Sequence, residues 1–266
     1  MTLTIAVTGK SGSGKTTTVK NLHAFFRKKY PEKTILLVDN DLSCELGHTF
    51  EKDVRKTLYG IRSGKHEYKT GIPANMTKQE FIEWAIEDII EPIDDCTDLI
   101  VSWLIGSKDC RCPITKQMND AVYKLISRYD VVIFDCEFDL KYLYQLVDTQ
   151  IDITLIVTRP FRESVRLAKR IEEYSAKYAV EGQMGILLNA VKEENKQKAH
   201  TLSEEFGLSV LGVVPFDDTL IENPEEKLSE KVQNAIEQFY FRLNIPRSDL
   251  LWQILLMEKL LLNKFI

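Results

Sequence analysis

Residues 9–17 of the chain are Gly9-Lys10-Ser11-Gly12-Ser13-Gly14-Lys15-Thr16-Thr17. They match the pattern G-x-x-x-x-G-K-[ST]. An apolar run from Leu3 to Thr8 comes directly before them, and Thr16 to Tyr30 follows with apolar residues at helical spacing. A strand, a glycine-rich turn and a helix in this order are the context in which the pattern binds phosphate. The sequence therefore predicts a phosphate-binding loop over residues 9–17.

Each part of this loop has a chemical reason. Glycines allow the backbone to turn its N–H groups toward phosphate oxygens, and the N-terminus of the following helix adds positive potential. Lys15 is placed to reach the β- and γ-phosphates, and the Thr16 hydroxyl is placed to bind Mg²⁺. We therefore expect ATP or ADP with Mg²⁺ at residues 9–17.

The rest of the chain repeats the same alternation of predicted strands and helices. A second apolar run, Lys33 to Asp39, completes a βαβ unit, which implies a parallel pair of strands. Later apolar runs are continuous rather than alternating, as in strands covered on both faces. We predict an α/β fold with a doubly wound, mostly parallel sheet of about seven strands flanked by helices. The later predicted strands are 99–103, 131–134, 153–157, 185–188 and 210–214, and two of the later helices are 114–129 and 162–178.

Composition limits the class of protein. The chain has 266 residues, 44% hydrophobic and 28% charged, which is ordinary for a globular protein. Its net charge of −5 disfavours a general nucleic-acid binder. The N-terminus lacks a secretory pattern and no run of about 18 apolar residues occurs, so we expect a cytoplasmic protein without stable membrane insertion.

Three segments fall outside this alternation of strands and helices. Gly60 to Ala74 is polar and is interpreted as a surface excursion. Thr77 to Ile90 is predicted as a helix, with Thr77 as N-cap and Glu80 as its capping-box partner. After Pro246, the segment Arg247 to Ile266 is apolar almost all round a helix. We therefore divide the chain into an ATPase domain, 1–245, and a C-terminal helical tail, 246–266.

Two features leave alternatives open. Lys10 comes directly after the first glycine and marks the deviant form of the motif. In that form this lysine resembles an arginine finger that reaches the nucleotide of the partner subunit. The alternative is a solvated lysine in a small-molecule kinase. Cys110 and Cys112 form a C-x-C pair that suits a soft metal ion. Because about four ligands are usual, two copies in a homodimer would complete a site for nickel, zinc or an iron–sulfur cluster. Two unrelated thiols are the alternative.

The order of these motifs resembles the CooC family, the nickel-insertion ATPases that mature carbon monoxide dehydrogenase and are related to MinD and the nitrogenase iron protein. The resemblance covers residue 1 to about 228. It implies ATP-driven closure of a homodimer and delivery of metal to a client enzyme of the carbon monoxide dehydrogenase type. It is carried by residues 9–16, 38–41, 71–73, 76–80, 110–113, 135–137, 188–189 and 212–217.

The resemblance also assigns roles to single residues. Asp41 corresponds to the switch I aspartate that positions the attacking water, which makes Lys10, Lys15 and Asp41 the expected catalytic groups. Asp39 and Asp135 correspond to the aspartates near Mg²⁺, with Thr16. The adenine would lie against Asn189, Pro215 and Phe216.

The chain departs from this family after Asp135. Phe138 and Asp139 stand where relatives have Ala-Gly, and Leu42 replaces an expected proline. Because the missing glycine contacts the γ-phosphate in relatives, we expect slow hydrolysis. A nucleotide-gated scaffold of the MinD type that barely hydrolyses ATP is therefore the main alternative, and a small-molecule kinase is the third.

Overall fold

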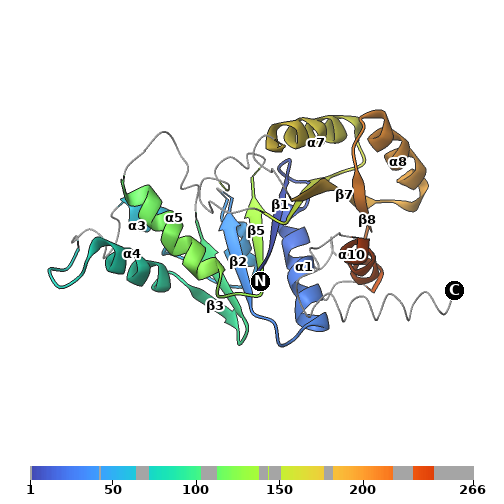
Figure 1. Cartoon of the computed structure of the whole chain (residues 1–266). Helices are drawn as coiled ribbons and strands as arrows, with labels where there is room; N and C mark the ends of the chain where they lie inside the picture. Colours follow the sequence, from blue (N-terminus) through green and yellow to red (C-terminus); the bar gives the residue numbers. More distant parts are fainter. Residues whose placement is uncertain are drawn as a thin grey trace.

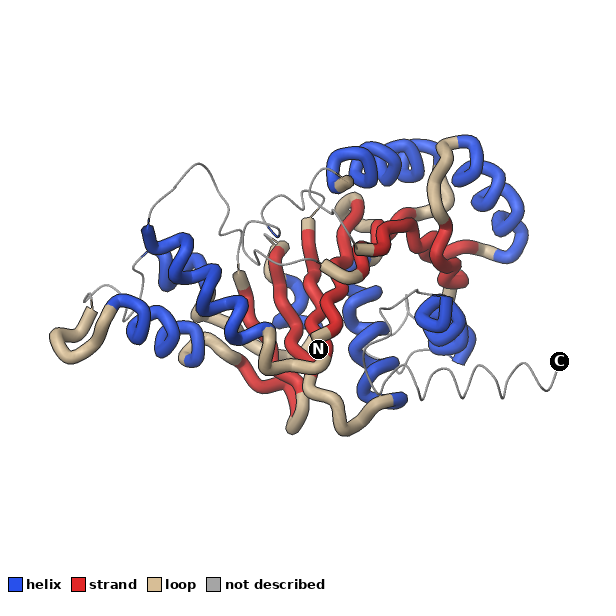
Figure 2. The backbone as a smooth tube through the Cα atoms, in the orientation of Figure 1, coloured by secondary structure: helices blue, strands red, loops and turns tan. Residues whose placement is uncertain are grey.

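The computed structural model describes residues 2–41, 43–63, 72–102, 113–137, 143, 151–176, 182–217 and 230–242. These residues form a single eight-stranded sheet with the order β3-β4-β2-β5-β1-β6-β7-β8. Every neighbouring pair is parallel except β3 and β4. Figures 1 and 2 show this sheet running through the middle of the molecule with helices on both sides.

The strands are short and mostly buried, and β1, β2, β5 and β6 are buried along their whole length. Apolar side chains on both faces of these strands explain the continuous apolar runs in the sequence. The strands are β1 (Leu3–Gly9), β2 (Ile35–Asn40), β3 (Glu91–Asp94), β4 (Thr97–Val101), β5 (Val131–Cys136), β6 (Ile153–Thr158), β7 (Gln183–Val191) and β8 (Val210–Pro215).

Helices cover the two faces unequally. One face packs against α1 and α10, and the other against α3, α4 and α5 at one end and against α7 and α8 at the other. The helices are α1 (Lys15–Lys29), α2 (Glu45–Thr49), α3 (Leu58–Ser63), α4 (Lys78–Glu87), α5 (Pro113–Ile126), α7 (Arg162–Ser175), η2 (Glu193–Asn195), α8 (Lys196–Glu205) and α10 (Glu230–Arg242).

The predicted sheet is confirmed, with one strand more than expected. All seven predicted strands occur, although β4 starts at Thr97 and ends at Val101. The eighth, β3, is a short antiparallel partner of β4. Its sequence, Glu-Pro-Ile-Asp, has little strand character of its own, so pairing with β4 rather than local propensity forms it.

The other predictions had mixed outcomes. The capping box of α4 is confirmed, because the Thr77 hydroxyl accepts a hydrogen bond from the Glu80 N–H and the Glu80 carboxylate accepts one from the Thr77 N–H. The surface excursion from Gly60 is wrong in its first residues, since Gly60 and Ile61 are buried in α3. The tail, 246–266, lies outside the described residues. Within the described part, no helix is long and apolar enough to cross a membrane.

Candidate nucleotide site

The glycines of residues 9–17 are required by the backbone. Gly9, Gly12 and Gly14 have φ angles of 146°, 73° and 98°, a region that L side chains rarely adopt. A Cβ atom on Gly9 would lie 2.2 Å from the carbonyl oxygen of Val157 in β6. The turn therefore passes too close to β6 for any side chain at its first position, and it leads directly into α1.

Lys15 is the first residue of α1, and only 9% of its side chain is exposed. Its Nζ lies 3.4 Å from Oδ2 of Asp41, which follows β2. Burial works to raise the pKa of Asp41, but hydrogen bonds from Ser43 and the charge of Lys15 lower it overall. The structure thus brings the predicted lysine and the predicted switch I carboxylate together as an ion pair at the carboxyl edge of the sheet.

Asp135 and Thr16, both predicted to lie near Mg²⁺, are joined by a hydrogen bond. The Thr16 hydroxyl donates to Oδ2 of Asp135 at 2.7 Å. The other carboxylate oxygen of Asp135, Oδ1, is buried without a hydrogen-bond partner. Burial raises the pKa of Asp135 to about 7. A buried, unsatisfied carboxylate oxygen beside a hydroxyl is costly alone and is satisfied by a cation, so these residues fit Mg²⁺.

No cluster of three or more His, Cys, Asp or Glu side chains suited to a metal occurs among the residues described. Phosphate-bound Mg²⁺ usually takes only one or two protein groups and keeps several waters.

Asp39, also predicted to lie near Mg²⁺, accepts two hydrogen bonds from the main chain. Its Oδ1 accepts from the N–H of Asp41 at 3.1 Å, and its Oδ2 accepts from the N–H of Leu46 at 3.0 Å. Burial raises the pKa of Asp39 to about 6. In this structure the side chain holds the loop that carries Asp41 against the start of α2. Its predicted contact with Mg²⁺ stays a prediction.

Asn189, at the end of β7, reaches back to the loop. Its Nδ2 donates to the carbonyl oxygen of Ser13 at 2.9 Å, and its Oδ1 accepts from the N–H of Ala190. Ala190 itself has a φ of 54°, which is unusual for a residue with a side chain. The end of β7 is therefore locked to the phosphate loop.

The segment predicted to contact adenine follows β8. The Phe216 N–H donates to the carbonyl oxygen of Val191 at 2.9 Å, and the Nζ of Lys192 lies 5.0 Å from the centre of the Phe216 ring. Pro215 ends β8 beside it. Asn189, Pro215 and Phe216 thus gather at the ends of adjacent strands. Sequence reasoning missed Lys192, whose only signal was its position three residues after Asn189.

The remaining predicted side chains are either exposed or outside the described residues. Lys10 is exposed and has no ion pair within the described part of the chain. Cys110, Cys112, Phe138 and Asp139 lie outside the described residues, so the metal pair and the altered switch stay predictions. Thr17 lies in the first turn of α1 and is exposed.

Taken together, a strand, a glycine turn with three positive φ angles, a helix that starts at a buried lysine, and a Thr–Asp corner define a P-loop ATPase with a mostly parallel sheet. The chain belongs to the CobQ/CobB/MinD/ParA nucleotide-binding domain family, whose sequence pattern matches residues 4–230. It is an ATP-binding ATPase of that family.

Individual relatives agree with this family. An uncharacterized ATP-binding protein of Methanocaldococcus jannaschii is 28% identical over 221 residues, which are 82% of this chain and 86% of that protein. The MinC:MinD cell division complex of Aquifex aeolicus has the same fold, with a TM-score of 0.66, 19% identity and coverage of 92% of this chain and 98% of that one.

MinD of Pyrococcus horikoshii, solved with Mg-ADP, gives a TM-score of 0.62 at 19% identity, covering 91% of this chain and 95% of that one. These comparisons support the MinD/ParA type and do not single out the nickel-insertion ATPases that the order of motifs resembles.

Proposed function

We propose that this protein is an ATP-dependent molecular switch, in which ATP binding closes a homodimer and hydrolysis reopens it. The observation that carries the proposal is the Lys15–Asp41 ion pair of 3.4 Å. Lys15 is the group that the loop presents to the β- and γ-phosphates. Arriving phosphates compete with Asp41 for the same ammonium group, so binding of ATP releases the carboxylate that is expected to orient water.

The link from Asp41 to the rest of the fold supports a switch. Asp39 joins the main chain at Asp41 to the start of α2 through two hydrogen bonds. A movement of Asp41 is therefore transmitted to α2, whose Leu46 and Gly47 are buried against the core. ATP drives a conformational change only if it binds the open and closed forms with different affinity, and the need to break this pair in one form would supply such a difference.

Lys10 supports the homodimer. Its side chain is exposed and makes no ion pair with the described residues, although it lies between the buried positions of the loop. Within the described part of the chain this cation has no ion-pair partner, so we infer that it is available to a phosphate of a second subunit. We infer that it stabilises the charge that develops on the partner's nucleotide, a contribution worth about 10³–10⁵ in rate in other P-loop enzymes.

Purified Lys10→Ala, Lys15→Ala and wild-type protein would be compared for ATP affinity by calorimetry, for mass by sedimentation with a non-hydrolysable ATP analogue, and for turnover. Lys15→Ala should lose ATP binding, because its contacts to phosphate are charge-assisted. Lys10→Ala should bind ATP and lose at least about 100-fold in turnover. Lys198→Ala, an exposed lysine of α8, is the matched control. A wild-type protein that stays monomeric with the analogue would refute the switch.

A finer function, metal delivery of the CooC type, is our second candidate, and the C-x-C pair favours it. Cys110 and Cys112 belong to the connection between β4 and α5. Ser102, which begins this connection at the carboxyl end of β4, is buried and donates through its main-chain N–H to the carbonyl oxygen of Asp39 at 2.8 Å. Ser102 is therefore held next to the aspartate that holds the Asp41 loop. A soft-metal site that two subunits share at Cys110 and Cys112 would be coupled to nucleotide binding through this contact.

A further inference from the structure

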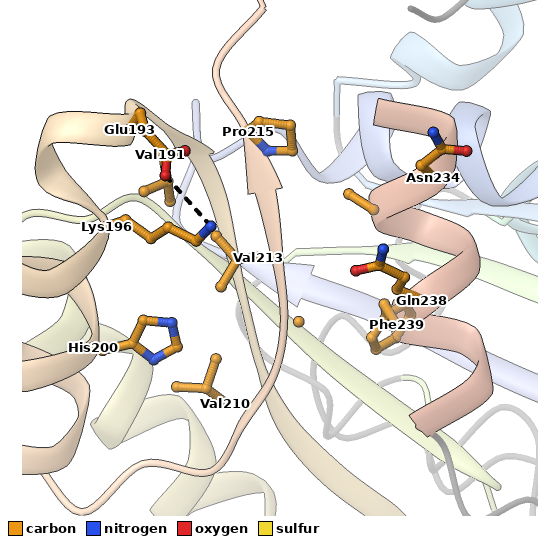
Figure 3. Close-up of a pocket in the computed structure, with 12 residues that line it drawn as sticks. Val191, Glu193, Lys196, His200, Val210, Val213, Pro215, Asn234, Gln238 and Phe239 are labelled. Carbon is orange, nitrogen blue, oxygen red and sulfur yellow. Dashed lines mark ion pairs between the residues drawn. The ribbon is translucent and has the colours of Figure 1, made fainter. Parts of the chain in front are cut away.

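A groove of about 440 Å³ runs along β8, and none of its lining residues belongs to the phosphate loop. Residues of β8 form its floor, α8 forms one wall and α10 forms the other (Figure 3). Its volume lies within the range of ordinary ligand sites. The proposed switch uses none of its residues except Pro215, at one end.

The floor of this groove is the edge of the sheet. Among the described strands, β8 pairs only with β7. An edge strand presents main-chain N–H and C=O groups toward its open side, where another extended chain can pair with them. The opposite edge is protected, because β3 carries Pro92, which has no N–H to donate. Four residues of β8, Val210, Gly212, Val213 and Pro215, line the groove, so it follows most of the strand.

The walls carry polar groups in pairs. Lys196 and His200 are four residues apart on α8, and Asn234 and Gln238 are four apart on α10, so each pair lies on one helix face. Figure 3 shows Lys196 and Gln238 pointing toward one another from opposite sides of β8. A carboxamide both donates and accepts hydrogen bonds, as a peptide group does. An extended peptide in the groove could therefore pair with the main chain of β8 and form hydrogen bonds with the side-chain amides of α10.

The charge of the α8 wall indicates the side chain such a peptide should carry. Lys196 is the first residue of α8, where the helix dipole adds positive potential, and the first turn holds no acidic residue. Its Nζ lies 3.6 Å from Oε1 of Glu193, with side-chain exposures of 54% and 77%. Such an exposed pair contributes about 0–1 kcal/mol, so a carboxylate from a ligand can replace Glu193.

We propose that this groove binds an extended segment of a partner protein, which adds a strand along β8 and places an acidic side chain against Lys196. The main-chain pairing supplies affinity and the contact with Lys196 supplies sequence preference, as in other cases of strand addition. The proposal does not rest on the proposed switch, because no lining residue belongs to the phosphate loop, and Thr16 and Asp135 do not line the groove; Pro215 is the one lining residue also predicted near adenine.

The test is selection of a phage-displayed library of random dodecapeptides against the wild-type protein and against Lys196→Glu. The wild type should enrich peptides with Asp or Glu at one position within a β-prone sequence, and Lys196→Glu should enrich Lys or Arg there. Synthetic copies of the peptides selected on the wild-type protein should bind Lys196→Glu and Gln238→Ala at least tenfold more weakly than they bind the wild type. Lys198→Glu, the same charge reversal outside the groove, should bind them normally. ATP affinity and melting temperature show that each variant is folded.

Three results would overturn the proposal. One is the absence of any enriched sequence, and another is enriched peptides that bind Lys196→Glu and Gln238→Ala as well as the wild type. The third is occupation of the groove by the chain itself. That outcome would appear as displacement of the selected peptides by a synthetic 247–266 peptide, or as a self-association of the nucleotide-free protein that Gln238→Ala abolishes.

Discussion

The side-chain nitrogen of Asn189 donates a hydrogen bond of 2.9 Å to the carbonyl oxygen of Ser13, across 176 residues of sequence. A Cβ atom on Gly14 would lie 2.2 Å from the same nitrogen. Asn189 therefore fills the space that a side chain on Gly14 would need. The end of β7 and the phosphate loop are held together by one residue that must be small and another that must be an amide.

Gly14→Ala is expected to weaken ATP binding by more than about tenfold, or 1.4 kcal/mol. The added methyl group would clash with Asn189, and the φ of 98° at position 14 is strained for alanine. Gly12→Ala is the matched control, because Gly12 also has a positive φ, 73°, but has no atom within 4 Å of an added Cβ. Calorimetry on both variants measures the difference. Equal losses would show that the contact with Asn189 has no importance.

Asp135→Asn should remove the benefit of Mg²⁺ for nucleotide binding. Its buried Oδ1 has no hydrogen-bond partner, and an amide at this position lacks the negative charge that attracts a cation. The wild type should bind ATP more tightly with Mg²⁺ than with a chelator, whereas the variant should bind equally in both. A variant that keeps the full effect of Mg²⁺ would place the ion elsewhere.

His23 makes the folding stability depend on pH. Burial, only partly offset by the charge of Asp94, lowers its pKa to about 4 from 6.5. Below pH 6.5 the unfolded chain takes up a proton that the folded protein refuses, so the contribution of His23 to stability is full above that pH. It is lost progressively as the pH falls from 6.5 to about 4, up to about 3 kcal/mol in total.

His23 lies between elements, with its Nε2 3.1 Å from the Thr97 hydroxyl and its ring edge-on to Phe50. Asp94 and Arg27 are the charged groups that face it. His23→Gln should therefore flatten the decline of the unfolding free energy between pH 6.5 and 4.5, measured by urea denaturation relative to wild type. The same slope in both proteins would contradict the assignment.

The Cys110→Ser, Cys112→Ser double variant tests the metal site. If the pair is shared between two subunits, the reduced wild type should bind one soft metal ion or one cluster per dimer, and the double variant none. Cys96→Ser, a half-buried cysteine in the turn between β3 and β4, is the control. Elemental analysis gives the amount of metal per chain, and sedimentation gives the number of chains in the assembly. One metal ion bound per monomer by the double variant would exclude the site.

The C-terminal tail is tested by truncation after Asn244. A segment that is apolar all round must be covered, either by its own domain or by a partner surface. Removal should lower the melting temperature by several degrees, or leave it unchanged and abolish association with the second subunit or a client. A truncated protein unchanged in all of these properties would show that the tail has neither role.

The local elements were predictable because they depend on nearest neighbours in the chain. Glycines at positions 9, 12 and 14, a lysine at the start of a helix and continuous apolar runs each follow from short-range chemistry. The same holds for the capping box of Thr77 and Glu80, whose partners are three residues apart. By contrast, β3 was missed because its pairing with β4, and not its own composition, makes it a strand.

Thus the sequence alone determined the α/β class, the phosphate loop and the residue types suited to nucleotide and Mg²⁺. Only the tertiary structure decided which of them meet: Asn189 with Ser13, Thr16 with Asp135, and Lys15 with Asp41. It also showed that Asp39 holds the main chain at Asp41 and Leu46. The physical reason is that strand order, which no local pattern encodes, brings distant strand ends together, while burial at that edge sets the charge state of their side chains.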